Sequence, residues 1–229
     1  MSDRLIICMQ AYNEEDMIRY SIPSVYNDCD EIILIDGAVE GWFPTIHSTD
    51  NTVELAKSFD VDKKMTVVQK DTYFKSLEEI KHVFTKYVPI GDYFCILDAD
   101  ELYMENSLTQ LRKIIAARAR YSEFIPIFKE FAVDLFHCLP PFPCKCNITN
   151  QRIVKNEPGA RWDVHHPTMA VGPNGSIDTC LDYRYADRRV VVSDMFIYHL
   201  SNLKSRDFLI DKRVRYYTTF DKNPPAIAR

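Results

Sequence analysis

The chain has 229 residues, of which 46% are hydrophobic and 27% are charged. These values are ordinary for a globular protein and exclude a largely disordered chain. The formal net charge of −5 argues against a nucleic-acid partner, because nucleic-acid-binding proteins carry a basic surface.

No apolar run approaches the ~20 residues that a transmembrane helix needs, so we expect no transmembrane segment. The N-terminus also lacks the apolar stretch of ~7–15 residues typical of a secretory signal. The seven cysteines are expected to be reduced thiols in a chain of this length. Together these features predict a cytoplasmic protein.

The first hundred residues alternate short apolar runs with helical patterns. Helices are predicted to begin at Asn13, which can cap a first turn with three acids, at the polar segment 48–51, and at the capping box that opens with Ser76. Pro23 is expected to end or kink the first helix. Strands are predicted over residues 5–9, 31–35, 65–69 and 93–97. This alternation predicts an α/β protein with a mostly parallel sheet and helices on both faces.

Polar residues follow three of these strands, at positions 12–14, 36–37 and 98–101. In open parallel sheets, ligands bind outside the carboxyl ends of the strands. Asp98 and Asp100 directly follow an apolar strand, and their hard oxygen atoms suit Mg²⁺ or Mn²⁺, which can bridge two phosphates. A pair of aspartates alone is a weak signal, but three polar strand ends in register favour a ligand site at this edge.

The pattern changes after residue 104. A helix is predicted from the apolar spacing of residues 108–115, and strands over 123–131, 152–154, 169–171, 190–192 and 195–198. The three prolines of the segment 139–146 exclude a central strand there. This half is therefore expected to be a smaller region of mixed or antiparallel pairing. Residues 203–229 carry seven Lys and Arg against three Asp, a net charge of +4, and are expected to form a helix and a tail.

Four segments in this order resemble the family 2 glycosyltransferases of the GT-A fold: residues 7–15, 30–37, 48–52 and 91–101. The resemblance implies inverting transfer of a sugar from a UDP- or GDP-sugar to an acceptor hydroxyl, assisted by Mn²⁺ or Mg²⁺. It covers about the first 104 residues and implies that residues 1–104 bind the nucleotide-sugar donor. We interpret residues 105–202 as the acceptor-binding half of the same domain. The acceptor class stays open between a glycan, a lipid-linked molecule and a protein. The basic residues 204–229 are candidates for peripheral contact with a membrane surface.

The family pattern assigns roles to individual positions. Tyr12 is expected near the base, and Asp36 is expected to accept a hydrogen bond from the base. The donor site is thus predicted to contain Ala11, Tyr12, Glu14, Asp36, Lys81, Asp98 and Ala99. The metal ligands are predicted to be Asp98, Asp100 and His199.

The acceptor hydroxyl needs a general base within hydrogen-bond reach. Asp163 is the first candidate and His166 the second, both in the segment 159–167. One departure from the family is a ten-residue insertion, 38–47, between Asp36 and the following helix start. A second departure is that the Arg-Asn pair of the family before the fourth strand is missing, so that Lys75 or Lys81 is the candidate for the diphosphate contact. Arg152 and Arg161 can pair with phosphate, but arginines near a loop are more often surface residues, and we interpret them so.

Two other functions stay open. A sugar-nucleotide nucleotidyltransferase shares the α/β architecture and metal carboxylates, but such enzymes carry a glycine-rich basic loop after the first strand, where this chain has Gln-Ala-Tyr-Asn-Glu-Glu. A non-catalytic module that binds nucleotide sugars is the other alternative. Turnover with an acceptor separates this module from a transferase, and pyrophosphate release from a triphosphate identifies the nucleotidyltransferase.

Overall fold

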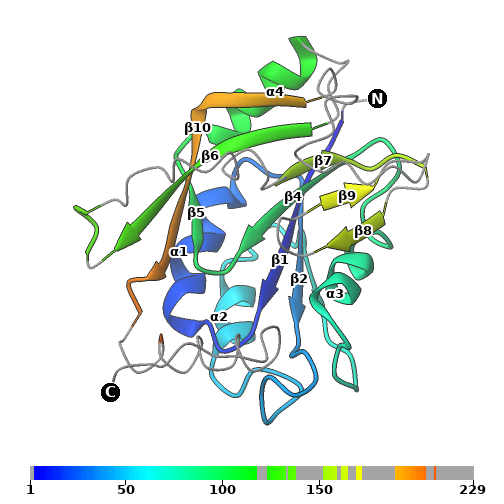
Figure 1. Cartoon of the computed structure of the whole chain (residues 1–229), viewed down its shortest axis with the longest axis vertical. Helices are drawn as coiled ribbons and strands as arrows, with labels where there is room; N and C mark the ends of the chain where they lie inside the picture. Colours follow the sequence, from blue (N-terminus) through cyan, green and yellow to red (C-terminus); the bar gives the residue numbers. More distant parts are fainter. Residues whose placement is uncertain are drawn as a thin grey trace.

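The computed structural model describes residues 3–117, 123–132, 134–137, 152–158, 161–164, 169–171, 189–204 and 209. Its first half contains the predicted alternation of strands and helices (Figure 1). The strands are β1 (Leu5–Ala11), β2 (Glu31–Asp36), β3 (Met65–Val68) and β4 (Tyr93–Asp98). The helices are α1 (Glu15–Tyr26), α2 (Thr52–Ser58) and α3 (Leu77–Phe84).

The second half adds short strands and one more helix. These elements are β5 (Glu101–Tyr103), α4 (Ser107–Ala117), β6 (Glu123–Ala132), β7 (Ile153–Lys155), β8 (Arg161–Val164), β9 (Met169–Val171) and β10 (Arg189–Asn202). The main sheet has the order β3-β2-β1-β4-β7-β6-β10-β5, and β8 pairs with β9 in a separate hairpin. The first four strands in this order are parallel, whereas β7 is antiparallel to both β4 and β6. The α/β class and the mixed second half are therefore confirmed.

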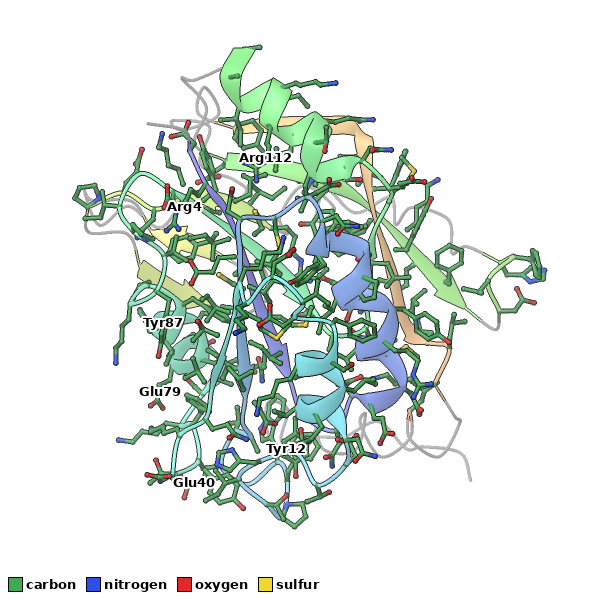
Figure 2. All side chains as sticks on the ribbon, turned by 180° about the vertical axis from the view of Figure 1, so that it is seen from behind. Arg4, Tyr12, Glu40, Glu79, Tyr87 and Arg112 are labelled. Atoms are coloured by element: carbon green, nitrogen blue, oxygen red, sulfur yellow. The ribbon has the colours of Figure 1, made fainter. Side chains whose placement is uncertain are left out.

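The sheet is covered on both faces, and each strand contributes to both covered faces because its alternate side chains point in opposite directions. Leu5, Ile7 and Met9 of β1 lie in one buried cluster with residues of α1, α2 and α4. Ile6 and Cys8 lie in a second cluster with residues of α3. The central strands are consequently apolar throughout, as strands buried on both faces must be. Figure 2, viewed from behind, shows α1 and α2 lying over the strands.

Several local predictions are corrected. Asn13 is not the cap of α1, since the helix begins at Glu15 after Glu14, and Asn13 has a positive φ of 51°. The Asn13 side chain instead accepts a hydrogen bond from the backbone N–H of Thr49 at 2.8 Å. Pro23 does not end α1, which continues to Tyr26. Pro23 is exposed, so the carbonyl that lacks its N–H partner can be hydrated.

The largest difference is at β10. Two short strands were predicted there, but one strand of 14 residues pairs with β6 on one side and β5 on the other. A register shift lies between Val192 and Phe196, and such a bulge absorbs the polar Ser-Asp step that interrupts the apolar pattern. His199 consequently lies within the strand, opposite Glu101 of β5, rather than after it.

Candidate functional site

The candidate site lies at the carboxyl ends of β1 and β4. In the parallel register Gln10 stands opposite Asp98, and Ala11 stands opposite Asp36, so the ends of three strands meet. Figure 2 shows Tyr12 at the same end of the molecule as Glu40, with Arg4 toward the other end. Ala11 and Ala99 are both buried at this edge. This is the position at which open α/β sheets bind their ligands.

Asp36 is fully buried at the end of β2 and anchors the insertion that follows it. One carboxylate oxygen accepts from the backbone N–H of Ser48 at 3.0 Å and from its hydroxyl at 2.6 Å. The other oxygen accepts from the side-chain amide of Gln69 at 2.8 Å. The Asp36 side chain is 1% exposed. It can accept a hydrogen bond from a nucleobase only if it loses one of the hydrogen bonds to Ser48 or Gln69.

The insertion 38–47 folds over Tyr12. The ring of Phe43 stacks on the Tyr12 ring with 4.0 Å between centroids and 28° between planes. The Tyr12 hydroxyl shares a hydrogen bond of 2.7 Å with the hydroxyl of Thr45. Tyr12 thus lies at the predicted edge of the sheet. Its ring is covered by Phe43, which belongs to the insertion that the family pattern lacks.

The acidic run after β4 is bound to a buried arginine. Arg152, just before β7, donates to Asp98 Oδ2 at 3.0 Å and to Glu101 Oε1 at 2.5 Å. Its side chain is 7% exposed, so the interpretation of Arg152 as a surface residue is wrong. Burial acts to lower the pKa of Arg152, but the two carboxylates raise it above its ordinary value. Glu101, which is fully buried, also accepts from the backbone N–H of Asp98 at 3.0 Å, and its burial raises the pKa of its carboxyl group.

Lys81 of α3 belongs to the same charged cluster. Its side chain is buried, and burial together with the nearby Arg152 charge lowers its pKa to about 8, while Asp98 and Glu101 act in the opposite direction. The structure therefore places Lys81 beside the acidic run, where a contact with phosphate was predicted.

A second charged cluster forms around Asp100. The ammonium of Lys204 donates to both carboxylate oxygens of Glu14 at 2.6 Å and lies 3.8 Å from Oδ2 of Asp100. The other Asp100 oxygen lies 3.8 Å from Nε2 of His199. The backbone N–H of Leu200 donates to the Asp100 carbonyl at 2.9 Å, and this bond holds the end of β10 against the acidic run. Lys204 thus points into the site, although it was grouped with a basic surface tail.

The three predicted metal ligands do not converge. Asp98 is engaged by Arg152, while Asp100 faces His199 and Lys204. Across the described part of the chain, no three side chains of His, Cys, Asp or Glu come close enough together to hold a metal ion. The arrangement therefore does not fit a three-ligand centre for Mn²⁺ or Mg²⁺.

The structure does not describe the side chains of the two predicted general bases. The backbone of Asp163 belongs to β8, its side chain is not described, and His166 lies outside the described residues. Sequence reasoning did not assign Phe43, Arg152 or Lys204 to the site. The ring of Phe43 was visible as part of an aromatic insertion, but nothing in the local sequence of Arg152 or Lys204 marks their acidic partners.

Comparisons with known proteins agree with this geometry. The family model described as glycosyl transferase family 2 matches residues 6–122. The crystal structure of S. aureus TarS is similar over 93% of this chain and 39% of that one, with 16% identity and a TM-score of 0.59. A crystal structure of S. aureus TarS 1–349 in complex with UDP-GlcNAc is similar over 93% of this chain and 65% of that one, with 14% identity and a TM-score of 0.59. This chain therefore spans less than two thirds of the length of these structures.

No curated protein matches the chain by sequence. Among the residues that the structure describes, none of the helices has the length and apolar character required to cross a membrane. The family match covers just over half of the chain, and the sheet has the architecture of GT-A structures. The chain therefore belongs to glycosyl transferase family 2 and has the GT-A fold.

Proposed function

We propose that this protein transfers a sugar from a UDP- or GDP-sugar to an acceptor hydroxyl with inversion at the anomeric carbon. The observation that carries the proposal is the meeting of Tyr12, Asp98 and Asp100 at the carboxyl ends of β1 and β4. Family membership supports the reaction class. The complex of TarS 1–349 with UDP-GlcNAc supports a nucleotide-sugar donor.

The reaction is a single displacement. The acceptor oxygen attacks the anomeric carbon and forms the new glycosidic bond, while the bond from that carbon to the diphosphate oxygen breaks and the nucleoside diphosphate leaves. The hydroxyl proton passes to a general base, for which we propose Asp163, with His166 as the alternative. We propose that the base binds beside Tyr12, on the side that the stacked Phe43 ring does not cover, and that Asp98 and Ala99 contact the ribose.

Negative charge develops on the diphosphate as the bond breaks, so fixed cations near the strand ends stabilise the transition state. Lys81 lies beside Asp98 and is a proposed diphosphate contact. This mechanism includes no Mn²⁺ or Mg²⁺ ion, because the side chains of the three predicted ligands, Asp98, Asp100 and His199, do not converge.

The first experiment is donor turnover by the full chain. UDP- and GDP-sugars are incubated with glycan, lipid-linked and protein acceptors, and release of the nucleoside diphosphate is measured. Asp100→Asn should abolish most of the activity, because it removes a charge from the centre of the site. Asp92→Asn is the matched control, since Asp92 precedes β4 at its opposite end and pairs with Arg4 at 2.9 Å. Binding of donor without transfer to any acceptor would favour a non-catalytic module.

The stereochemistry and the base are tested separately. Proton NMR of the product should show the anomeric configuration opposite to that of the donor. Asp163→Asn should lower turnover by roughly 10²–10⁴-fold with little change in donor affinity, as expected for loss of a general base. If Asp163→Asn keeps full turnover and His166→Asn does not, the base is His166. Pyrophosphate release from a nucleoside triphosphate and a sugar phosphate would contradict the transferase assignment.

A further inference from the structure

The ammonium of Lys204 lies beside Asp100, one of the three predicted metal ligands. It is held by both oxygens of Glu14 at 2.6 Å and lies 3.8 Å from Asp100 Oδ2. The Lys204 side chain is only 9% exposed, and the carboxylates of Glu14 and Asp100 are also largely buried. A single cation is thus shared by two acids, one at the end of β1 and one at the end of β4.

The position of the Lys204 backbone is set by the neighbouring strands. Lys204 follows β10, whose end is fixed by pairing with β5 and β6 and by the bond from the Leu200 N–H to the Asp100 carbonyl. A lysine that approaches two carboxylates in this way is a preorganised charge, because little reorganisation is needed when an anion arrives.

The same geometry opposes a divalent ion at Asp100. A Mg²⁺ ion binds carboxylate oxygens at ~2.0–2.1 Å, which would bring it close to an ammonium that is itself 3.8 Å from Oδ2. Repulsion between two cations at such a distance is strong where water is largely excluded. Of the other predicted ligands, Asp98 is paired with Arg152, so only His199, whose Nε2 lies 3.8 Å from Asp100 Oδ1, is placed to share an ion with Asp100.

We propose that Lys204 is the cation that binds the diphosphate of the donor in place of a divalent ion. This inference rests on the proposed donor site. The ammonium has three donor hydrogens, so it can keep a contact with Glu14 while it donates to a phosphate oxygen. On bond cleavage its charge offsets the charge that develops on the leaving nucleoside diphosphate.

The test is calorimetric binding of UDP and GDP to the full chain, in EDTA and in Mn²⁺. The wild type should bind one of them in EDTA with an affinity close to that in Mn²⁺. Lys204→Met should bind it at least roughly tenfold more weakly in EDTA, because a charge-assisted hydrogen bond to phosphate is lost. Mn²⁺ should restore part of this loss, since Glu14 and Asp100 are then released from the lysine.

Lys155→Met is the matched control, because Lys155 stands opposite Tyr93 at the amino end of β4 and pairs with Asp3 at 3.1 Å. It should bind like the wild type in both buffers, and Lys204→Arg should keep binding in EDTA. Wild-type binding that requires Mn²⁺ would overturn the proposal and leave the donor site in place, and this comparison needs no folded variant. Unchanged binding by Lys204→Met in EDTA would also overturn it. No binding of either nucleotide in any buffer would instead overturn the donor site itself.

Discussion

Arg152 is the residue whose loss should damage the fold most directly. Arg152→Met leaves the Glu101 carboxylate, which is fully buried, without its arginine at 2.5 Å. Removing one partner of a buried ion pair costs ~3–5 kcal/mol. The Asp98 carboxylate is 40% exposed, so water screens most of the charge that its lost bond uncovers, and this bond adds at most about 1 kcal/mol.

We therefore expect Arg152→Met to lower the free energy of unfolding by about 3–6 kcal/mol, measured by urea denaturation. In a chain of this size, that change lowers the melting temperature by roughly 6–24 °C. Arg4→Met is the control, since Arg4 is 40% exposed and pairs with Asp92 and Glu31 at the surface. It should cost no more than about 1 kcal/mol.

The origin of the loss is tested by a second substitution. Glu101→Leu in the Arg152→Met background removes the unpaired buried charge, so it should recover most of the stability. The recovery is reduced by about 1 kcal/mol for the lost bond from the Asp98 N–H. A loss below about 1 kcal/mol in Arg152→Met, or a double variant no more stable than the single one, would refute the reasoning.

Three further outcomes are expected. Gly37→Ala places a Cβ 2.5 Å from Cε2 of the buried Phe74, and this overpacking should cost ~1–3 kcal/mol in urea denaturation. Ser48→Ala removes the hydroxyl that donates to Asp36 at 2.6 Å, which should cost ~1.5–3 kcal/mol in a thermal melt because the acceptor is charged. Burial raises the pKa of Cys29 from 9.0 to about 11, so the unfolded thiol ionises first and the free energy of unfolding should fall between about pH 9 and 11. Urea denaturation at pH 8 and pH 11 checks this, and Cys29→Ala should show a smaller fall.

The first half of the fold was predictable because its central strands contain continuous apolar runs between polar breaks. Runs such as Leu5–Ala11 and Tyr93–Asp98 are buried on both faces, so burial alone identifies them. The strands of the second half are shorter or irregular. β5 has three residues and begins at the last residue of the acidic run 98–101, while β10 contains a bulge that separates its two apolar parts.

The acidic side of the site was predictable for a related reason. Asp36, Asp98 and Asp100 each stand at or just after the end of a strand, and parallel strands bring their ends to one edge. The insertion 38–47 was visible in the sequence, but stacking of Phe43 on Tyr12 was not, because it depends on how the loop returns to β2. That return is fixed by the buried Asp36 carboxylate and Ser48.

Two cations of the site, Arg152 and Lys204, were missed because their acidic partners lie far away in the sequence. Arg152 reaches Asp98 across 54 positions, and Lys204 reaches Glu14 across 190. A cluster of acids in a sequence indicates that positive charge must lie nearby, and a divalent metal ion is the source that is usually inferred. In this fold Arg152 pairs with Asp98 and Glu101, and Lys204 lies between Glu14 and Asp100. The two cations differ in a way that matters for the proposed chemistry, because the buried arginine holds the end of β4, whereas the lysine is the one that we propose to bind the diphosphate.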